Sequence, residues 1–237
     1  MSSIAKNIEA IKQKIGDATL IAVSKTKPNE MLVEAYDAGQ LDFGENYVQE
    51  LVDKHEALPK DIRWHMIGHL QSNKVKYIAP FIHLIHGVDS LKLLQEINKQ
   101  GIKNNRVIDC LLQVHIAQEE TKFGFDPHEI LELINSDELK KLDHVCIKGL
   151  MTMGSNTEDV TQVEREFKQV RELFDKVSSK ISEVGSDTEK STILNLTTEI
   201  LSMGMSGDFE LAVKCGSNMV RVGSLIFGER NYSSKTA

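Results

Sequence analysis

The chain has 237 residues, of which 41% are hydrophobic and 27% charged, and its formal net charge is −7. This composition is typical of a globular protein, and the length suits one large α/β barrel or two small domains. The negative charge argues against a nucleic-acid binder, because phosphate contacts generally require a basic surface. No apolar run approaches membrane-spanning length and the N-terminus lacks the apolar core of a signal peptide, so we expect no membrane association.

The cysteines are few and far apart in the sequence: Cys110, Cys146 and Cys215. None belongs to a Cys-x-x-Cys pair, so neither a zinc site nor a disulfide framework is indicated. We therefore expect buried, reduced thiols in a cytoplasmic protein.

Apolar runs and helical patterns alternate along the N-terminal half. Isoleucines at helical spacing between residues 4 and 15 predict a first helix, with Ser3 as its N-cap and Gly16 at its end. The apolar run at 20–23 then predicts a buried strand that leads into Lys25. Further strands are predicted at 41–46, 63–68, 81–86 and 107–114, and helices at 29–38, from 47, at 71–79 and after an Asp89 cap.

The C-terminal half continues the alternation. Asp126, Pro127 and Glu129 predict a helix start, because they supply a cap, a first-turn proline and a reciprocal glutamate. A capping box at 155–158 precedes a long amphipathic helix, and Ser206 is predicted to cap a later, shorter one. Strands are predicted at 144–150, 192–196 and 219–222, with a polar loop at 186–190 and a polar tail from about residue 231.

Eight strands, each followed by a helix, predict a parallel sheet closed into a single (β/α)8 TIM barrel over residues 1–237. A doubly wound open sheet is the alternative fold. No Pro/Gly/Ser-rich linker divides the chain in two.

Lys25 is the first candidate for chemistry. It ends a buried strand in phase with Ile21 and Val23, where partial loss of water lowers a lysine pKa and lets the neutral amine attack a carbonyl. The simpler interpretation is a lysine that extends its amine from a strand end into solvent. In a barrel the active site lies at the carboxyl ends of the strands, and Lys25 is predicted to share that rim with other residues: Asn46, His65, Gly68, His86, His115, Met151 and Arg221.

Two glycine-bearing turns near the C-terminus favour phosphate binding. One contains Ser206 before a predicted helix, and the other, Arg221 to Ser224, follows the last strand. Barrels often bind phosphate between the loops after strands seven and eight. Arg221 is either a donor to a ring nitrogen or phosphate, or part of a salt bridge with Glu45 or Asp208. His65 and His69 are four residues apart, but the strand pattern does not align them, so no metal is proposed.

With these residues assembled, the chain resembles the pyridoxal phosphate homeostasis protein family, whose members carry pyridoxal 5′-phosphate (PLP) on a barrel like that of alanine racemase, the fold type III PLP-binding barrel. The resemblance spans nearly the whole chain and is carried by residues 22–25, 43–50, 64–74, 201–206 and 220–228.

The resemblance implies that Lys25 holds PLP as a Schiff base, that Arg221 faces the pyridine nitrogen and that Asn46 lies beside the cofactor. It also implies that the phosphate is held by three residues: Ser206, Gly223 and Ser224. His65, at the predicted rim, completes the predicted cofactor-binding set, which includes no catalytic residue. His115 and Asn218 depart from the family pattern; His115 is expected to affect the pocket mouth and Asn218 to be structural.

Three functions compete for this site. The first is PLP homeostasis without turnover, by a monomer whose partners are PLP and, as a candidate class, apo-enzymes that require it. The second is a PLP-dependent amino-acid racemase-like enzyme, although alanine racemases use a tyrosine from an added C-terminal β domain, whereas here a short polar tail follows strand eight and its closing segment. The third is a cofactor-free Schiff-base aldolase.

Overall fold

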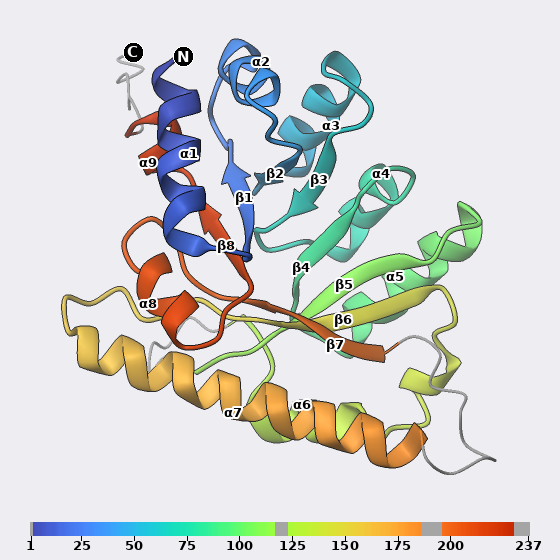
Figure 1. Cartoon of the computed structure of the whole chain (residues 1–237). Coiled ribbons are helices and arrows are strands. Elements are labelled where there is room, and N and C mark those ends of the chain that lie inside the picture. The colour runs from blue at the N-terminus through green and yellow to red at the C-terminus, as the bar shows by residue number, and fades with distance from the viewer. Residues whose placement is uncertain (1, 117–122, 186–195, 230–237) are drawn as a thin grey trace, which may run out of the picture.

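The computed structural model describes residues 2–116, 123–185 and 196–229. Within these ranges, eight parallel strands follow one another around a closed barrel, and the last strand pairs with the first (Figure 1). The strands are β1 Thr19–Val23, β2 Asp42–Glu45, β3 Arg63–Met66, β4 Leu84–Val88, β5 Ile108–Gln113, β6 Val145–Met151, β7 Leu196–Ser202 and β8 Met219–Val222. The predicted barrel is confirmed.

Helices lie on the outside of the barrel (Figure 1). They are α1 Ser3–Ile15, α2 Asn29–Asp37, α3 Val48–Ala57, α4 Val75–Ile78, α5 Leu91–Lys103, α6 Pro127–Leu133, α7 Val160–Gly185, α8 Phe209–Lys214 and α9 Ser224–Phe227, with short 3-10 turns at Ser72–Lys74 and Leu139–Lys141. Helix α1 lies beside α9, and Asn7 Nδ2 donates a hydrogen bond to the Ile226 carbonyl at 3.1 Å. The N-terminal helix therefore packs against the last described helix, beside the paired strands β1 and β8.

Alternating side chains give the barrel two different cores. Residues such as Phe43 and Trp64 point outward and pack beneath the helices in the main apolar core. A separate apolar cluster fills part of the interior: Ile21, Leu84, Leu111, Met151 and Met219. The interior also contains buried polar side chains, namely Asp42, His65, His86, Ser202 and Arg221.

Side-chain hydrogen bonds supplement the short pairing of β7 with β8. Only Ser202 and Met219 are paired across it in the described residues. Asn218 Oδ1 accepts a hydrogen bond from the Leu201 N–H at 2.8 Å, and Asn218 Nδ2 donates to the Glu199 carbonyl at 2.6 Å. Asn218 is thus structural, as expected.

Several predicted element ends are wrong. Helix α1 is capped by Ser2 and α5 by Ser90, each one residue from the predicted cap. The predicted capping box at 155–158 is absent from the described start of α7, where Asp159 Oδ1 instead accepts hydrogen bonds from the backbone of Thr161 and Gln162. Neighbouring polar residues share capping propensity, so composition alone does not choose among them.

Two strands are shifted from their predicted positions. Strand β4 begins at Leu84, three residues after the predicted start, and β7 continues from Leu196 to Ser202. Most of the strand predicted at 192–196, the loop at 186–190 and the tail from about 231 lie outside the described residues. The helix start at Asp126 is confirmed, with both hydrogen bonds of a capping box.

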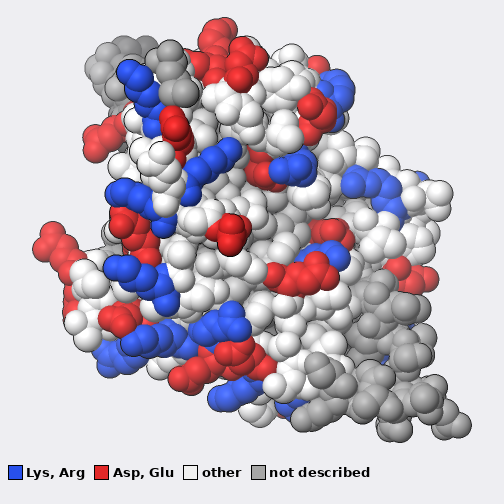
Figure 2. Space-filling view, in the orientation of Figure 1, with Lys and Arg blue, Asp and Glu red and all other residues white. Residues whose placement is uncertain are grey.

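The described helices include none that combines the length and apolar character needed to cross a membrane. On the face that Figure 2 shows, basic and acidic side chains are interspersed. That face therefore offers no broad basic patch of the kind that binds nucleic acid.

Candidate functional site

A cavity of about 280 Å³ opens at the carboxyl ends of the strands. Six of the seven predicted cofactor-binding residues line it: Lys25, Asn46, Ser206, Arg221, Gly223 and Ser224. They come from the ends of β1 and β2, from β8 and from the turns after β7 and β8. The fold thus gathers residues nearly 200 positions apart at the end of the barrel where such folds hold their active sites.

Lys25 lies two residues beyond β1, on a backbone that is fixed on both sides. Before it, the buried Ser24 donates its hydroxyl to Glu45 Oε1 at 2.6 Å. After it, Thr26 has a φ of 64° and donates its N–H to Glu50 Oε1 at 2.6 Å. A positive φ is strained for a β-branched residue, and such strain concentrates at functional sites.

A buried lysine on α3 holds this turn from behind. Lys54 is 4% exposed, and its Nζ donates to the Ser24 carbonyl at 2.7 Å, to Glu45 Oε1 at 2.8 Å and to Glu50 Oε1 at 2.7 Å. Burial raises the pKa of Glu45 to about 7, although the Lys54 ammonium opposes that rise. Sequence reasoning missed Lys54 because a helical lysine ordinarily faces solvent; the available signal was its i,i+4 spacing from Glu50.

The second lysine of the cavity has a structural contact. Lys27 Nζ donates to the carbonyl oxygens of Phe227, Gly228 and Glu229 at 3.2, 2.9 and 2.9 Å. It therefore ties the loop after β1 to the end of α9. These contacts make Lys27 a poor candidate for a nucleophilic amine.

The two predicted phosphate turns meet in the cavity. The backbone N–H of Gly223 donates to Ser206 Oγ at 3.2 Å. A Cβ at Gly223 would lie 3.0 Å from the Val23 carbonyl oxygen, so glycine permits this close approach to β1. The prediction that Ser206 caps a helix is wrong: α8 begins after Asp208, and Ser206 instead joins the two turns.

Arg221 is buried in β8, beside Ile21 of β1. Its Nη1 donates to the Ser202 carbonyl at 3.0 Å and to Ser202 Oγ at 2.6 Å, and its Nη2 donates to the Thr152 carbonyl at 2.9 Å. Burial lowers the pKa of Arg221 to about 10, so the side chain stays charged at neutral pH. In the described part of the chain no carboxylate forms an ion pair with it, neither Glu45 nor Asp208.

Asn46 follows directly after β2, and the loop after β3 comes very close to it. A Cβ at Gly68 would lie 2.8 Å from the Asn46 carbonyl oxygen and 2.9 Å from its Cα. Any larger residue at position 68 would therefore displace the backbone of Asn46.

His65 is not among the residues that line this cavity, so the geometry gives no support to its predicted place beside the cofactor. It is the third residue of β3 and points into the barrel interior, where it is 1% exposed. Its Nε2 lies 3.1 Å from Asp42 Oδ1 and its Nδ1 lies 2.9 Å from His86 Nε2. A strand pattern in the sequence shows that His65 belongs to β3, but it does not show how far below the rim the side chain lies.

Three other residues expected at the rim are also not among the residues that line the cavity. His86 and Met151 are buried inside the barrel, and His115 is not among the residues that line the cavity. Met153, two residues beyond β6, lines it instead. The three free cysteines are buried, as predicted.

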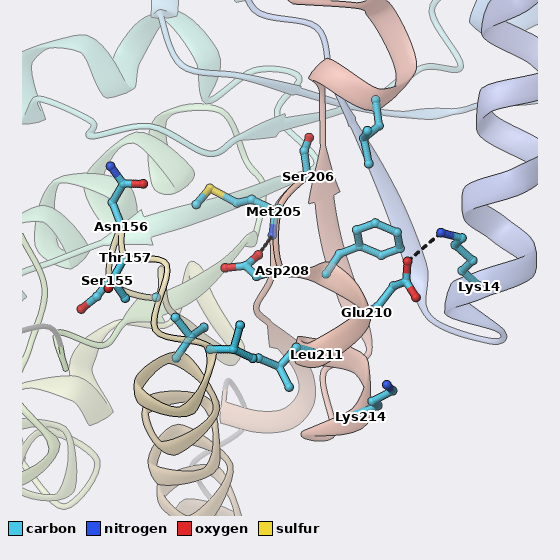
Figure 3. Close-up of a pocket in the computed structure, with 16 residues that line it drawn as sticks. Lys14, Ser155, Asn156, Thr157, Met205, Ser206, Asp208, Glu210, Leu211 and Lys214 are labelled. Atoms are coloured by element: carbon cyan, nitrogen blue, oxygen red, sulfur yellow. Dashed lines mark hydrogen bonds and ion pairs between the residues drawn. The ribbon is translucent and has the colours of Figure 1, made fainter.

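A larger cavity of about 660 Å³ adjoins the first, and the two share Met205, Ser206 and Gly207 (Figure 3). Lys14 and Glu210 form an ion pair at 2.7 Å on its wall, and Asp208 Oδ1 accepts the Met205 N–H at 2.6 Å. The Ser206 turn therefore forms a boundary between two cavities.

Comparison with known proteins identifies the family. Residues 1–231 match the family model described as the N-terminal domain of alanine racemase, which defines the class of barrel. The chain belongs to the pyridoxal phosphate homeostasis protein family. It is 38% identical to the protein of that name from Haemophilus influenzae, over 98% of both chains, and 39% identical to the human one, over 91% of this chain and 78% of the other.

Two solved structures are similar to this chain to different degrees. PipY from Synechococcus elongatus, in a structure described as having PLP bound, is 34% identical with a TM-score of 0.80, over 95% of this chain and 100% of PipY. Alanine racemase from Bartonella henselae is 16% identical with a TM-score of 0.67, over 97% of this chain and 60% of the racemase. This second likeness concerns the fold alone.

Proposed function

We propose that this protein binds PLP as a Schiff base on Lys25 and acts in PLP homeostasis without turnover. The observation that carries the proposal is the single cavity that Lys25, Arg221 and the joined turns of Ser206 and Gly223 line together. Relatives that match nearly the whole chain are named pyridoxal phosphate homeostasis proteins, and the similar PipY structure is described with PLP bound.

The residues of the cavity fit PLP chemically. PLP supplies an aldehyde, and a lysine amine condenses with an aldehyde by forming a C=N bond and releasing water. Lys25 would form this bond. The hydroxyls of Ser206 and Ser224 and the turn at Gly223 would hold the phosphate, and the Arg221 guanidinium would face the ring nitrogen. The volume of about 280 Å³ lies just below the range of about 300–1,000 Å³ that is typical of small-molecule sites, so the cavity suits a ligand at the small end of that range.

The absence of turnover rests on the titratable groups around the cavity. Among its described lining residues these are Lys25, Lys27 and Arg221. Racemisation needs one group to remove a proton and another to return it on the opposite face. Lys27 is held by three carbonyl oxygens and Arg221 remains charged, so neither suits the second role. A racemase-like enzyme is the alternative function.

Three further assignments belong to this proposal: a monomeric state, a cytoplasmic location and delivery of PLP to apo-enzymes. The cytoplasmic location is supported by three buried free cysteines, which need no oxidising compartment.

Titration with PLP tests the binding step, because a protonated Schiff base of PLP absorbs visible light. Two matched variants, Lys25→Arg and Lys27→Arg, each remove one amine and keep its charge. We expect the visible band in the parent protein and in Lys27→Arg, and its loss in Lys25→Arg. A band that survives in Lys25→Arg would count against the proposal.

A further inference from the structure

A line of buried polar side chains runs through the barrel interior and ends at Arg221. Arg221 Nη1 lies 2.6 Å from Ser202 Oγ, and Ser202 Oγ lies 3.2 Å from His86 Nδ1. His86 Nε2 lies 2.9 Å from His65 Nδ1, and His65 Nε2 lies 3.1 Å from Asp42 Oδ1. These five residues come from β2, β3, β4, β7 and β8, so the line joins distant parts of the chain.

The line connects the two ends of the barrel. Arg221 lines the cavity at the carboxyl ends of the strands. Asp42 and His65 line a different cavity of about 400 Å³ at the amino ends, where β1, β2, β3, β4 and β8 begin. The proposed PLP-binding role does not by itself require a line of buried side chains between these two cavities.

The chemistry of the two end groups assigns a direction to the hydrogen bonds. A guanidinium only donates, so Ser202 Oγ must accept from Arg221. Arg63 and His65 hold the pKa of Asp42 well below its ordinary value, so its carboxylate is ionised and only accepts. His65 must therefore present an N–H at Nε2 to Asp42.

The proton positions between the ends follow from this. Burial lowers the pKa of both His65 and His86, so each ring is neutral and carries one proton. With the His65 proton on Nε2, its Nδ1 accepts from His86 Nε2–H. His86 Nδ1 is then an acceptor, and it receives the Ser202 hydroxyl proton.

We propose that Ser202, His86, His65 and Asp42 form a one-way hydrogen-bond relay that positions Arg221 at the cavity. Every donor in it points from Arg221 toward Asp42. Neighbouring hydrogen bonds in such a chain polarise one another, so the Asp42 carboxylate stabilises a guanidinium that it does not touch. His65 and His86 are positioning residues for Arg221, and their effect on PLP rests on the proposed function.

A metal site is the competing interpretation of the end of the line that contains Asp42. Potential ligand atoms of Asp42, His65 and His83 lie within 4.8 Å of one another. However, Arg63 Nε and Nη2 donate to the two oxygens of Asp42 at 2.6 and 2.5 Å. A guanidinium already bound to both oxygens disfavours a second cation there, so we assign this end to the relay.

Imidazole ¹⁵N spectra of the protein without PLP test the relay directly. They report which nitrogen of each histidine carries the proton. We expect both His65 and His86 as neutral rings protonated at Nε2. A His86 ring protonated at Nδ1 in the parent protein would overturn the relay, and this measurement requires no variant.

Asp42→Asn is the decisive variant. Arg63 needs an acceptor, so the amide oxygen should turn to Arg63 and the amide N–H to His65. The proton of His65 should then move to Nδ1, and that of His86, which Asp42 does not contact, should follow to Nδ1. The matched control is Asp89→Asn, because Asp89 pairs with His69 at 3.1 Å outside the barrel interior. An unchanged His86 spectrum in folded Asp42→Asn would contradict the relay.

Addition of PLP then separates the relay from the proposed function. If Arg221 faces the bound ring, PLP should shift the ¹⁵N resonances of His86 and leave those of His69 unchanged. If the tautomers respond to Asp42→Asn but PLP shifts neither histidine, the relay stands and the placement of Arg221 against PLP fails. If the tautomers do not respond, the relay itself fails.

Discussion

The hydroxyl oxygen of Ser206 and the backbone nitrogen of Gly223 lie 3.2 Å apart, which brings the turns after β7 and β8 to one point of the cavity. We predict that Ser206→Ala weakens the binding of PLP more than that of pyridoxal, because only PLP carries the phosphate. A hydrogen bond to a charged group contributes about 1.5–3 kcal/mol, so the affinity for PLP should fall by at least about tenfold.

The control for this change is Ser155→Ala. Ser155 lines the adjacent larger cavity and donates its hydroxyl to Glu166, not to the smaller cavity. Both affinities can be measured by titration. Equal weakening of PLP and pyridoxal by Ser206→Ala would place the phosphate elsewhere.

Arg221 should control the protonation of the bound pyridine ring. A cation beside the ring nitrogen disfavours a proton there, whereas the carboxylate of Arg221→Glu should favour one. We therefore predict a changed absorbance spectrum of bound PLP in Arg221→Glu. Because Arg221 is buried, a carboxylate in its place can prevent folding. Arg221→Gln, which is neutral, is therefore the second variant for the same measurement. An unchanged spectrum together with a lower free energy of unfolding would assign Arg221 a purely structural role.

Glu45 should make the stability of the Lys25 turn depend on pH. Burial raises its pKa from an ordinary 4.5 to about 7 in the folded protein. The folded state then binds the proton more tightly than the unfolded state, so this contribution to stability is complete below pH 4.5 and is lost as pH rises to about 7. The whole change is on the order of 3 kcal/mol.

Glu45→Gln removes this titration. The free energy of unfolding of the parent, relative to that of Glu45→Gln, should fall between pH 4.5 and 7. The comparison is made as a difference because His83, whose pKa burial lowers to about 4, acts with the opposite sign in an overlapping range. Parallel pH profiles of the two proteins would refute this role of Glu45.

The purified protein loaded with PLP should leave D- and L-amino acids unchanged. The physical reason is that the described lining of the cavity offers Lys25 but no second proton donor and acceptor on another face. Chiral chromatography after long incubation measures this. Sustained racemisation that Lys25→Ala abolishes would make the protein an enzyme.

The barrel was predictable from the sequence because each βα unit has its own local pattern. The run at 20–23 and the pattern around Met219 to Val222 both appear as strands in the structure. Strand β7 was harder to predict, since Thr197, Thr198 and Glu199 interrupt its apolar residues. Its position is set by neighbouring strands, which local patterns do not describe.

The candidate site was predictable where residues follow strand ends, as Lys25 and Asn46 do. It was not predictable where the role of a residue depends on how deep its side chain lies in the barrel, or on a contact with a residue from another element. His65 was assigned to the cavity although it lies inside the barrel, and the part that Lys54 plays beneath the Lys25 turn was missed. Both roles depend on side chains from several elements that meet only in the folded protein.

The covalent attachment of PLP to Lys25 is the central claim, and borohydride reduction tests it most directly. Borohydride converts the C=N bond of a Schiff base into a stable secondary amine, which peptide mapping can locate. We predict that reduction of the PLP-loaded protein places the pyridoxyl group on Lys25. A pyridoxyl group on Lys27 or Lys74 instead would contradict the account.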